Sequence, residues 1–154
     1  MRAIIQRTLG ARVEIGGRIS GQIEQGLMIL LGVSENDTAQ EAQFLAKKIA
    51  NLRIFPDEQE KMNLSLLDID GQALVVSNFT LYANSKKGNR PSFAAAGRPE
   101  LAEPLYQQFM RELVAQGVAQ VQSGEFGADM QVYIQNDGPV TIFLDTDEIM
   151  PGKR

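Results

Sequence analysis

The chain is organised around the segment Ala73-Leu74-Val75-Val76-Ser77-Asn78-Phe79-Thr80-Leu81. It opens with four apolar residues, which is typical of a strand that is covered on both faces and lies near the middle of its sheet. From Ser77 polar and apolar residues alternate, and we expect the strand to continue with Asn78 and Thr80 on the face opposite to Phe79. Small polar side chains at the rim of a core need hydrogen-bond partners, which a bound ligand can supply. The alternative is a strand that frays into a loop and carries no site.

The composition is that of one globular domain. The chain has 154 residues, of which 44% are hydrophobic and 22% charged, enough for a substantial core. Its longest apolar run, residues 27–31, is far too short to span a bilayer. No basic and apolar leader opens the sequence, and cysteine is absent. We therefore expect a cytoplasmic protein without disulfide bonds.

Histidine is absent as well, and this limits the chemistry. A Ser-His or Cys-His nucleophile pair and an imidazole general base are excluded. A zinc site of thiolate or imidazole ligands is also excluded, so that only oxygen ligands remain for any metal. We expect no metal and no cofactor. An enzyme of this composition works with carboxylates, hydroxyls, amides, lysines, its backbone or groups of the substrate.

The charge distribution is uneven. The net charge is −4, which argues against a nucleic-acid partner. Between Gly71 and Pro99, however, there is no acidic residue, and this stretch contains four basic ones: Lys86, Lys87, Arg90 and Arg98. A basic surface on an acidic protein can still bind phosphate groups. A solvated loop without a partner is the alternative.

Most of the chain is predicted to form strands. They are expected over residues 1–7, 12–15, 18–23, 27–33, 63–69, 73–81, 118–122, 130–135 and 140–144. Gly16-Gly17 predicts a two-residue hairpin, and residues 8–11 a bend or bulge. Asp70-Gly71 predicts a second hairpin, which places residues 63–69 antiparallel to the central strand. Asp137-Gly138 predicts a turn between the last two strands.

Two helices are predicted. Thr38 and Glu41 form a capping box that starts the first helix, which we expect to end near Arg53. The second helix is expected from Glu100 to Gln116, with Pro104 tolerated only in its first turn. The predicted fold is α+β, with mostly antiparallel sheets packed together or curled into a barrel and two covering helices. We expect a single domain over residues 1–145 and a loose C-terminal tail over 146–154.

Four short motifs, taken together, resemble the D-aminoacyl-tRNA deacylase family. They are Ile4-Ile5-Gln6-Arg7, Ser77-Asn78-Phe79-Thr80-Leu81, Gly88-Asn89-Arg90-Pro91-Ser92-Phe93 and Asn136-Asp137-Gly138-Pro139-Val140-Thr141. The resemblance covers about residues 1–145 in order and spacing. One motif departs from the family, which usually has Gln where this chain has Asn78. The amide is kept, but the side chain is shorter by one methylene group.

The resemblance implies a homodimeric hydrolase without a cofactor, which acts in chiral proofreading. Such an enzyme cleaves the ester between a D-amino acid and the 3′-terminal ribose of tRNA, and it also removes glycine mischarged on tRNA. The peptide between Gly138 and Pro139 is implied to be cis and to reach the partner subunit's pocket. Its backbone would form a wall that excludes L-amino acids, and its carbonyl groups would meet the substrate ammonium.

Three sets of site residues follow from the motifs. The catalytic candidates are Ser77, Asn78, Phe79 and Thr80. The substrate-binding candidates are Met130, Asn136, Gly138, Pro139 and Thr141. The RNA-binding candidates are Lys86, Lys87, Arg90 and Arg98. Phe79 and Met130 are candidates for pocket walls, with plain core positions as the alternative.

The mechanism remains open between two hypotheses. In the first, the backbone amides of Phe79 and Thr80 hold the developing oxyanion, and water and the ribose 2′-OH handle the proton transfers. In the second, Thr80 is a nucleophile, although no base is visible to activate it. Two other functions also remain. A non-catalytic tRNA-binding module would bind tRNA without turnover, and a Ser- or Thr-dependent small-ester hydrolase would turn over without RNA.

Overall fold

The computed structural model describes residues 1–153. Its strands are β1 (Arg2–Ile15), β2 (Arg18–Ile23), β3 (Gly26–Gly32), β4 (Phe55–Pro56), β5 (Met62–Leu64), β6 (Gln72–Ser77), β7 (Val121–Ser123) and β8 (Gln131–Asp145). Its helices are α1 (Ala39–Ala50), the 3-10 helix η1 (Phe79–Tyr82), α2 (Pro99–Gln116) and α3 (Thr146–Ile149). None of the helices within residues 1–153 is long and apolar enough to cross a membrane.

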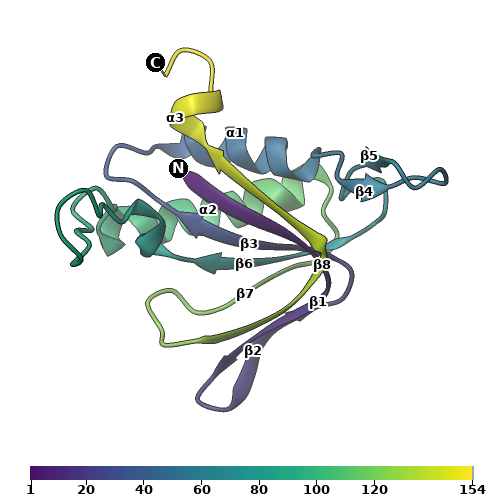
Figure 1. The fold of residues 1–154 in the computed structure, drawn as a ribbon, viewed down its shortest axis with the longest axis horizontal. Coiled ribbons are helices and arrows are strands. Elements are labelled where there is room, and N and C mark those ends of the chain that lie inside the picture. Colours follow the sequence, from purple (N-terminus) through teal and green to yellow (C-terminus); the bar gives the residue numbers. More distant parts are fainter. Residues whose placement is uncertain (154) are drawn as a thin grey trace.

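One curled sheet contains most of the strands (Figure 1). Its order is β2-β1-β3-β6-β7, and β8 pairs with the other side of β1. The first half of β1 pairs with β3 and the second half with β2, while β8 follows β1 along nearly its whole length. The sheet nearly closes where β2 approaches β7, and there the Ser20 hydroxyl donates to the Ser123 carbonyl at 3.3 Å. The α+β barrel predicted from the sequence is confirmed.

The central strand pairs differently from the prediction. β6 runs parallel to both β3 and β7, so the predicted antiparallel hairpin through Asp70-Gly71 is wrong. Residues 65–71 instead form a series of turns, in which the Gly71 amide donates to the Leu66 carbonyl at 3.0 Å. The strand ends at Ser77 and η1 follows, because the Asn78 side chain accepts the Thr80 amide and closes a tight turn.

The last two predicted strands are one strand, β8, and the predicted turn at Asp137-Gly138 is wrong. Both halves of β8 pair with β1, which holds the chain in one direction through the turn-forming residues. The pairing passes from Gln6 with Thr141 to Thr8 with Asn136, so residues 137–140 form a bulge opposite Arg7. The predicted bulge at residues 8–11 is confirmed as a second register shift, between Thr8 and Gly10. β1 nevertheless runs unbroken from Arg2 to Ile15, so the two strands predicted on either side of the bulge are one strand.

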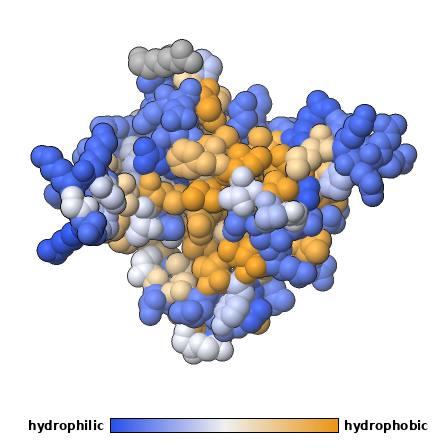
Figure 2. Space-filling model, in the orientation of Figure 1, coloured by the Kyte–Doolittle hydropathy of each residue, from blue (hydrophilic) through white to orange (hydrophobic). Residues whose placement is uncertain are grey.

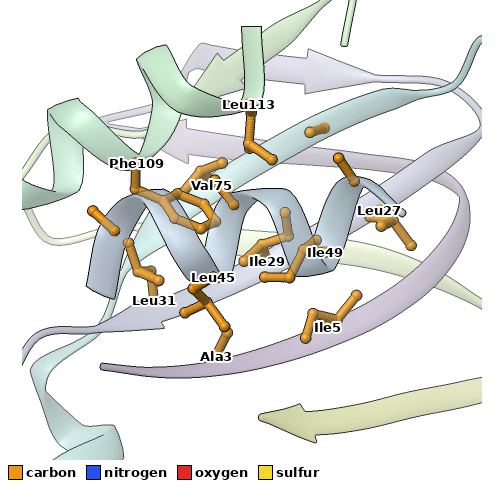
Figure 3. Close-up of a cluster of buried hydrophobic side chains, with 14 of the residues drawn as sticks. Ala3, Ile5, Leu27, Ile29, Leu31, Leu45, Ile49, Val75, Phe109 and Leu113 are labelled. Atoms are coloured by element: carbon orange, nitrogen blue, oxygen red, sulfur yellow. The ribbon is translucent and has the colours of Figure 1, made fainter. Parts of the chain in front are cut away.

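The main core lies between the sheet and the two long helices (Figure 3). Leu45 and Ile49 of α1 and Phe109 and Leu113 of α2 are fully buried against β1, β3 and β6. The capping box of α1 is confirmed, and the helix ends at Ala50, slightly before the predicted end. Gly117 caps α2 in the left-handed conformation, with a φ of 109°.

Pro104 lies inside α2, beyond its first turn, which corrects the prediction. The helix begins at Pro99. A proline in the second turn removes one backbone donor, and the burial of Leu105 and Phe109 on the same helix offsets this loss.

A second, smaller core fills the barrel interior. It consists of Ala11, Val13, Ile23, Met28, Leu74 and Val76. Met130, Val132 and Ile134 of the β8 region are partly buried against it. This interior layer forms the floor under the rim at which β6 ends.

The segment after β8 is held in place, in contrast to the loose tail predicted from the sequence. Asp145 caps α3 by accepting the Asp147 amide at 3.0 Å, and Thr146 is buried. The Lys153 ammonium forms ion pairs with Asp37, Glu41 and Asp147 at 3.0–3.3 Å. The sequence prediction for Arg154 lies outside the described residues.

Candidate active site

A cavity of about 840 Å³ opens at the rim of the barrel where β6 ends. It is lined by η1, the start of α2 and the loop before β8. Its lining residues include Ser77, Asn78, Phe79, Thr80, Phe93, Arg98, Phe126, Asp129 and Met130. This volume lies in the range of sites for small organic ligands. A smaller hollow of about 390 Å³ at residues 148–152 contains none of the predicted site residues.

The cavity brings together only part of the predicted site. All four catalytic candidates line it, together with Met130 and Arg98. The bulge residues 136–141 and the basic residues 86–90 lie outside its lining. The sequence-based prediction missed Phe93, Phe126 and Asp129. Phe93 belongs to a motif that was recognised, whereas no local pattern marks the other two.

The hydrogen bonds of Asn78 shape the turn that carries the catalytic candidates. Its backbone amide donates to the Leu31 carbonyl at 2.8 Å. Its side-chain oxygen accepts the Thr80 amide at 3.1 Å and also the Thr80 hydroxyl. The Thr80 amide is therefore occupied, which differs from the expectation that it is free for an oxyanion. Within residues 1–153, no hydrogen bond joins the Phe79 amide to another group.

Phe79 is not a core residue. It is 57% exposed, and its ring meets Phe93 edge-to-face with 5.1 Å between the centroids. The two rings form an apolar rim on the cavity. Met130 is partly buried against the interior core and lines the cavity from the opposite side, directly before β8. Both residues line the cavity, and their contact with a substrate stays a prediction.

The bulge of β8 presents an exposed Gly138-Pro139 peptide, which is cis in the structure. Gly138 has a φ of 111°. Asn136 closes the base of the bulge, because its side-chain amide donates to the Arg7 and Val140 carbonyls at 3.0 Å each. The peptide is therefore held out from the strand by bonds to both neighbours of the bulge.

Arg7 supports the bulge from inside. Its guanidinium is largely buried and donates to the Ile54 carbonyl at 2.7 Å. Its Nε lies 2.9 Å from an Asp137 carboxylate oxygen, in an ion pair without hydrogen-bond alignment. Thr141 lies beside the bulge, where its hydroxyl accepts from the Gln6 amide at 3.2 Å. Its hydroxyl also donates to the Asn136 side-chain oxygen at 3.4 Å, which links the strand beside Gly138 to the base of the bulge.

The basic loop projects from the body of the molecule beside η1 (teal in Figure 1). A bridge between Asn84 and Ser92 closes its base, with mutual backbone hydrogen bonds of 2.8 and 2.9 Å. Lys86, Lys87 and Arg90 are exposed at its tip, and Arg98 is exposed at the start of α2 on the cavity. The four cations thus extend from the cavity outward along one edge.

Comparison with known proteins places the chain in a family. Residues 4–145 match the family described as D-Tyr-tRNA(Tyr) deacylase. The D-aminoacyl-tRNA deacylase of Herpetosiphon aurantiacus is 55% identical over 153 residues, which covers 99% of each chain. That of Fusobacterium nucleatum is 53% identical over 148 residues, which covers 96% of this chain and 97% of the relative.

Solved structures share the fold of this chain. A structure described as the c-Myc DNA unwinding element binding protein is 43% identical, has a TM-score of 0.89 and covers 94% of this chain and 98% of its own. A structure described as a probable eukaryotic D-amino acid tRNA deacylase has a TM-score of 0.79 at 18% identity, which shows the shared fold. The full-length matches make the chain an enzyme, a hydrolase of ester bonds. Within that class, it belongs to the D-Tyr-tRNA(Tyr) deacylase family.

Proposed function

We propose that the protein hydrolyses the ester between a D-amino acid and the 3′-terminal ribose of tRNA, releasing the free D-amino acid and tRNA. The observation that carries this proposal is the segment Ser77–Thr80, exposed at Phe79 and Thr80, on a cavity of about 840 Å³, in a chain that matches the family over residues 4–145. Glycine mischarged on tRNA is also a substrate, because glycine has no side chain for a chiral site to reject. The activity is one of proofreading, in the cytoplasm where aminoacyl-tRNA is used.

The chain works as a homodimer in this proposal. Gly138-Pro139 is exposed and lies outside the lining of its own chain's cavity, which supports a role in a partner's pocket. Apolar side chains also gather across β1 and β8 (Figure 2), where Leu9, Tyr133 and Phe143 are between 43% and 51% exposed. Exposed apolar patches of this kind mark interaction surfaces. A second copy would cover them.

Chirality is read by the backbone of Gly138-Pro139. A rigid peptide leaves no room for the side chain of an L-amino acid, and its carbonyl oxygens accept from the substrate ammonium. Asn136 and Arg7 support this role because they hold the bulge from both sides. Met130 and Phe79 form the apolar walls around the amino-acid side chain.

The chemistry uses the backbone and the substrate. The Phe79 amide is the donor for the developing oxyanion, since the Thr80 amide is bonded to Asn78. The Thr80 hydroxyl donates to the amide oxygen of Asn78, which is not a base, and this argues against a nucleophilic role. Water attacks the ester, and the ribose 2′-OH assists the proton transfer. Ser77 lies on the same rim, at the end of β6.

The tRNA binds along the basic edge. Arg98 lies at the cavity, near the terminal nucleotide, and the loop cations Lys86, Lys87 and Arg90 contact phosphates further along the acceptor end. These contacts give affinity without base specificity, because they neutralise backbone charge.

The decisive experiment is deacylation of matched D- and L-aminoacyl-tRNA by the purified protein. We expect rapid release of the D-amino acid and of glycine, and little release of the L-amino acid. Binding of tRNA without turnover would favour a tRNA-binding module. Equal turnover of a small ester without RNA would favour a general esterase with a Ser or Thr nucleophile.

A further inference from the structure

The candidate catalytic turn η1 is too short to hold its own shape. It has four residues, and short 3-10 helices rely on their surroundings for stability. Phe79 and Thr80 are exposed at the cavity, so their own packing fixes them only weakly. The position of the turn must therefore come from its other contacts.

One such contact is a close approach to β3. Gly32 lies directly under η1, and a Cβ atom at this position would come within 2.9 Å of the Leu81 Cβ and 3.1 Å of the Asn78 carbonyl oxygen. Gly32 therefore lets the turn rest on the end of the strand. This contact is steric. It limits how close the turn can come but does not hold it there.

Arg2 supplies the attractive contacts at the far end of the turn. Its Nη1 donates to the Leu81 carbonyl at 3.0 Å, and its guanidinium carbon lies 4.5 Å from the centre of the Tyr82 ring. Its Nε donates to an Asp145 carboxylate oxygen at 2.7 Å. One planar group thus joins the end of η1 to the end of β8, the strand that carries Gly138-Pro139.

The anchor on β8 is itself fixed. Asp145 is 4% exposed and directly opposite Arg2 in the pairing of β1 with β8. Its second carboxylate oxygen caps α3 by accepting the Asp147 amide at 3.0 Å. The hydrogen bond to Asp145 raises the pKa of Arg2. An arginine side chain is charged at any working pH, so Arg2 keeps its charge-assisted bond to this buried anchor on β8.

We infer that Arg2 is a positioning residue for the candidate catalytic turn. It holds the Leu81 carbonyl and the Tyr82 ring against Asp145, and this keeps Phe79 and Thr80 in place at the cavity. Arg2 is absent from the lining of the site cavity and lines a separate hollow beside the basic loop, so it reaches the site cavity through η1 and not by its own contacts. The catalytic part of this inference rests on the proposed function.

The planar, forked guanidinium of arginine is required for Arg2 to bind Asp145 and the Leu81 carbonyl at the same time. A lysine carries a point charge that can pair with Asp145, but it does not bind the carboxylate and the carbonyl at once in the plane that stacks on Tyr82. Arg2→Lys should therefore retain the ion pair and lose the link to η1. Arg2→Met keeps an unbranched apolar side chain and removes every donor.

The test compares Arg2→Met and Arg2→Lys with a control, Arg53→Met. Arg53 also donates to a backbone carbonyl, that of Asn63 at 2.9 Å, but has no contact with η1. Melting temperature and single-turnover deacylation are measured for each, with tRNA affinity determined separately. Hydrogen exchange of the Leu81 and Ala83 amides reports the turn directly, whether or not the enzyme is active.

We expect Arg2→Met to lower the single-turnover rate by about 10- to 100-fold, because small misplacements of reacting groups have effects of this size. Its tRNA affinity should remain close to that of Arg53→Met. Its melting temperature should fall further than that of Arg53→Met, because Asp145 is buried and loses its partner, so the rates are compared per folded molecule. The rate of Arg2→Lys, which keeps this ion pair, should lie between those of the two Met variants. The Leu81 and Ala83 amides should exchange faster in Arg2→Met and in Arg2→Lys, which both lose the bond to the Leu81 carbonyl, than in Arg53→Met.

If the Leu81 and Ala83 amides exchange at the same rate in Arg2→Met as in Arg53→Met, Arg2 does not hold η1 in place. Faster exchange with an unchanged deacylation rate would overturn the positioning role. An inactive wild-type protein would refute the proposed function and the catalytic part of the inference together. The exchange result would then still decide whether Arg2 holds the turn.

Discussion

The substitution Gly138→Ala tests whether Gly138-Pro139 forms the proposed chiral wall, because the backbone conformation and the surroundings of Gly138 leave little room for a side chain. Gly138 has a φ of +111°, a conformation that L-residues rarely adopt. A Cβ there would lie 2.9 Å from the Val140 Cγ2, 3.0 Å from an Arg7 nitrogen and 3.1 Å from the Val140 amide nitrogen. Arg7 cannot move away easily, because it is buried and bonded to Ile54. The added methyl group therefore strains the bulge and moves the Gly138-Pro139 peptide.

Two magnitudes follow. A residue forced into a sparsely populated conformation costs about 1–3 kcal/mol of stability. For a domain of this size, each kcal/mol lowers the melting temperature by about 2–4 °C. A displacement of the peptide by about 1 Å would lower D-aminoacyl-tRNA hydrolysis by roughly 100-fold, beyond what partial unfolding explains.

A matched control separates strain from function. Gly17 also has a positive φ, of 81°, but an added Cβ would meet nothing within 4 Å. Gly17→Ala should therefore lose stability and keep full activity per folded molecule. Melting temperature and single-turnover deacylation of D- and L-aminoacyl-tRNA are measured on the same preparations. If Gly138→Ala is destabilised like Gly17→Ala and keeps full D-selective activity, the wall is not at Gly138.

Three further predictions concern tRNA binding, chemistry and acid stability. Replacing Lys86 and Lys87 by Ala should raise KM and flatten its logarithmic salt slope by about 1–2, whereas replacing the exposed lysines 47–48 of α1 should leave the slope unchanged; equal slopes would contradict phosphate binding. Thr80→Val should keep substantial activity, while a 2′-deoxy terminal ribose should abolish most of it. The reverse ordering in a deacylation assay would contradict the substrate-assisted mechanism. Glu41 is buried, which raises its pKa, but hydrogen bonds from Thr38 and Lys153 outweigh burial and hold the pKa at about 2, below the ordinary 4.5. The ionised form is thus favoured in the folded state, and this stabilisation, of up to about 3 kcal/mol, is present above pH 4.5 and lost as the pH falls towards 2. Glu41→Gln should flatten the pH dependence of the unfolding free energy in this window. An unchanged acid transition would show that ionised Glu41 does not stabilise the folded state.

Local sequence patterns determined the elements whose stability is local. The capping box at Thr38, the hairpin at Gly16-Gly17 and the left-handed cap at Gly117 are each built from residues a few positions apart. The apolar runs of β3 and β6 marked the two strands at the centre of the fold, because only doubly covered strands tolerate such runs. The family resemblance was carried by motifs, and the family match over residues 4–145 confirms it.

Tertiary structure decided what depends on distant partners. Asp70-Gly71 and Asp137-Gly138 are both strong turn signals, yet β6 pairs in parallel with β3, and β8 runs through the second signal as a bulge. Backbone hydrogen bonds over many paired residues outweigh the turn preference of two residues. The local sequence does not indicate which strand will be the pairing partner. The 3-10 turn at Phe79–Tyr82 likewise replaced the predicted alternation, because the Asn78 side chain caps it and Gly32 of β3 leaves room for it.

The candidate site divides in the same way. The sequence supplied Ser77 to Thr80 and Gly138-Pro139, because these motifs have a recognisable composition. The structure added Phe93 and the residues 126–129, and the latter reach the cavity only because the barrel curls and brings the loop before β8 opposite η1. It also separated Gly138 from the cavity of its own chain. The sequence motifs indicate which residue types can form the site. The distances between these residues depend on the pairing of strands that lie far apart in the sequence.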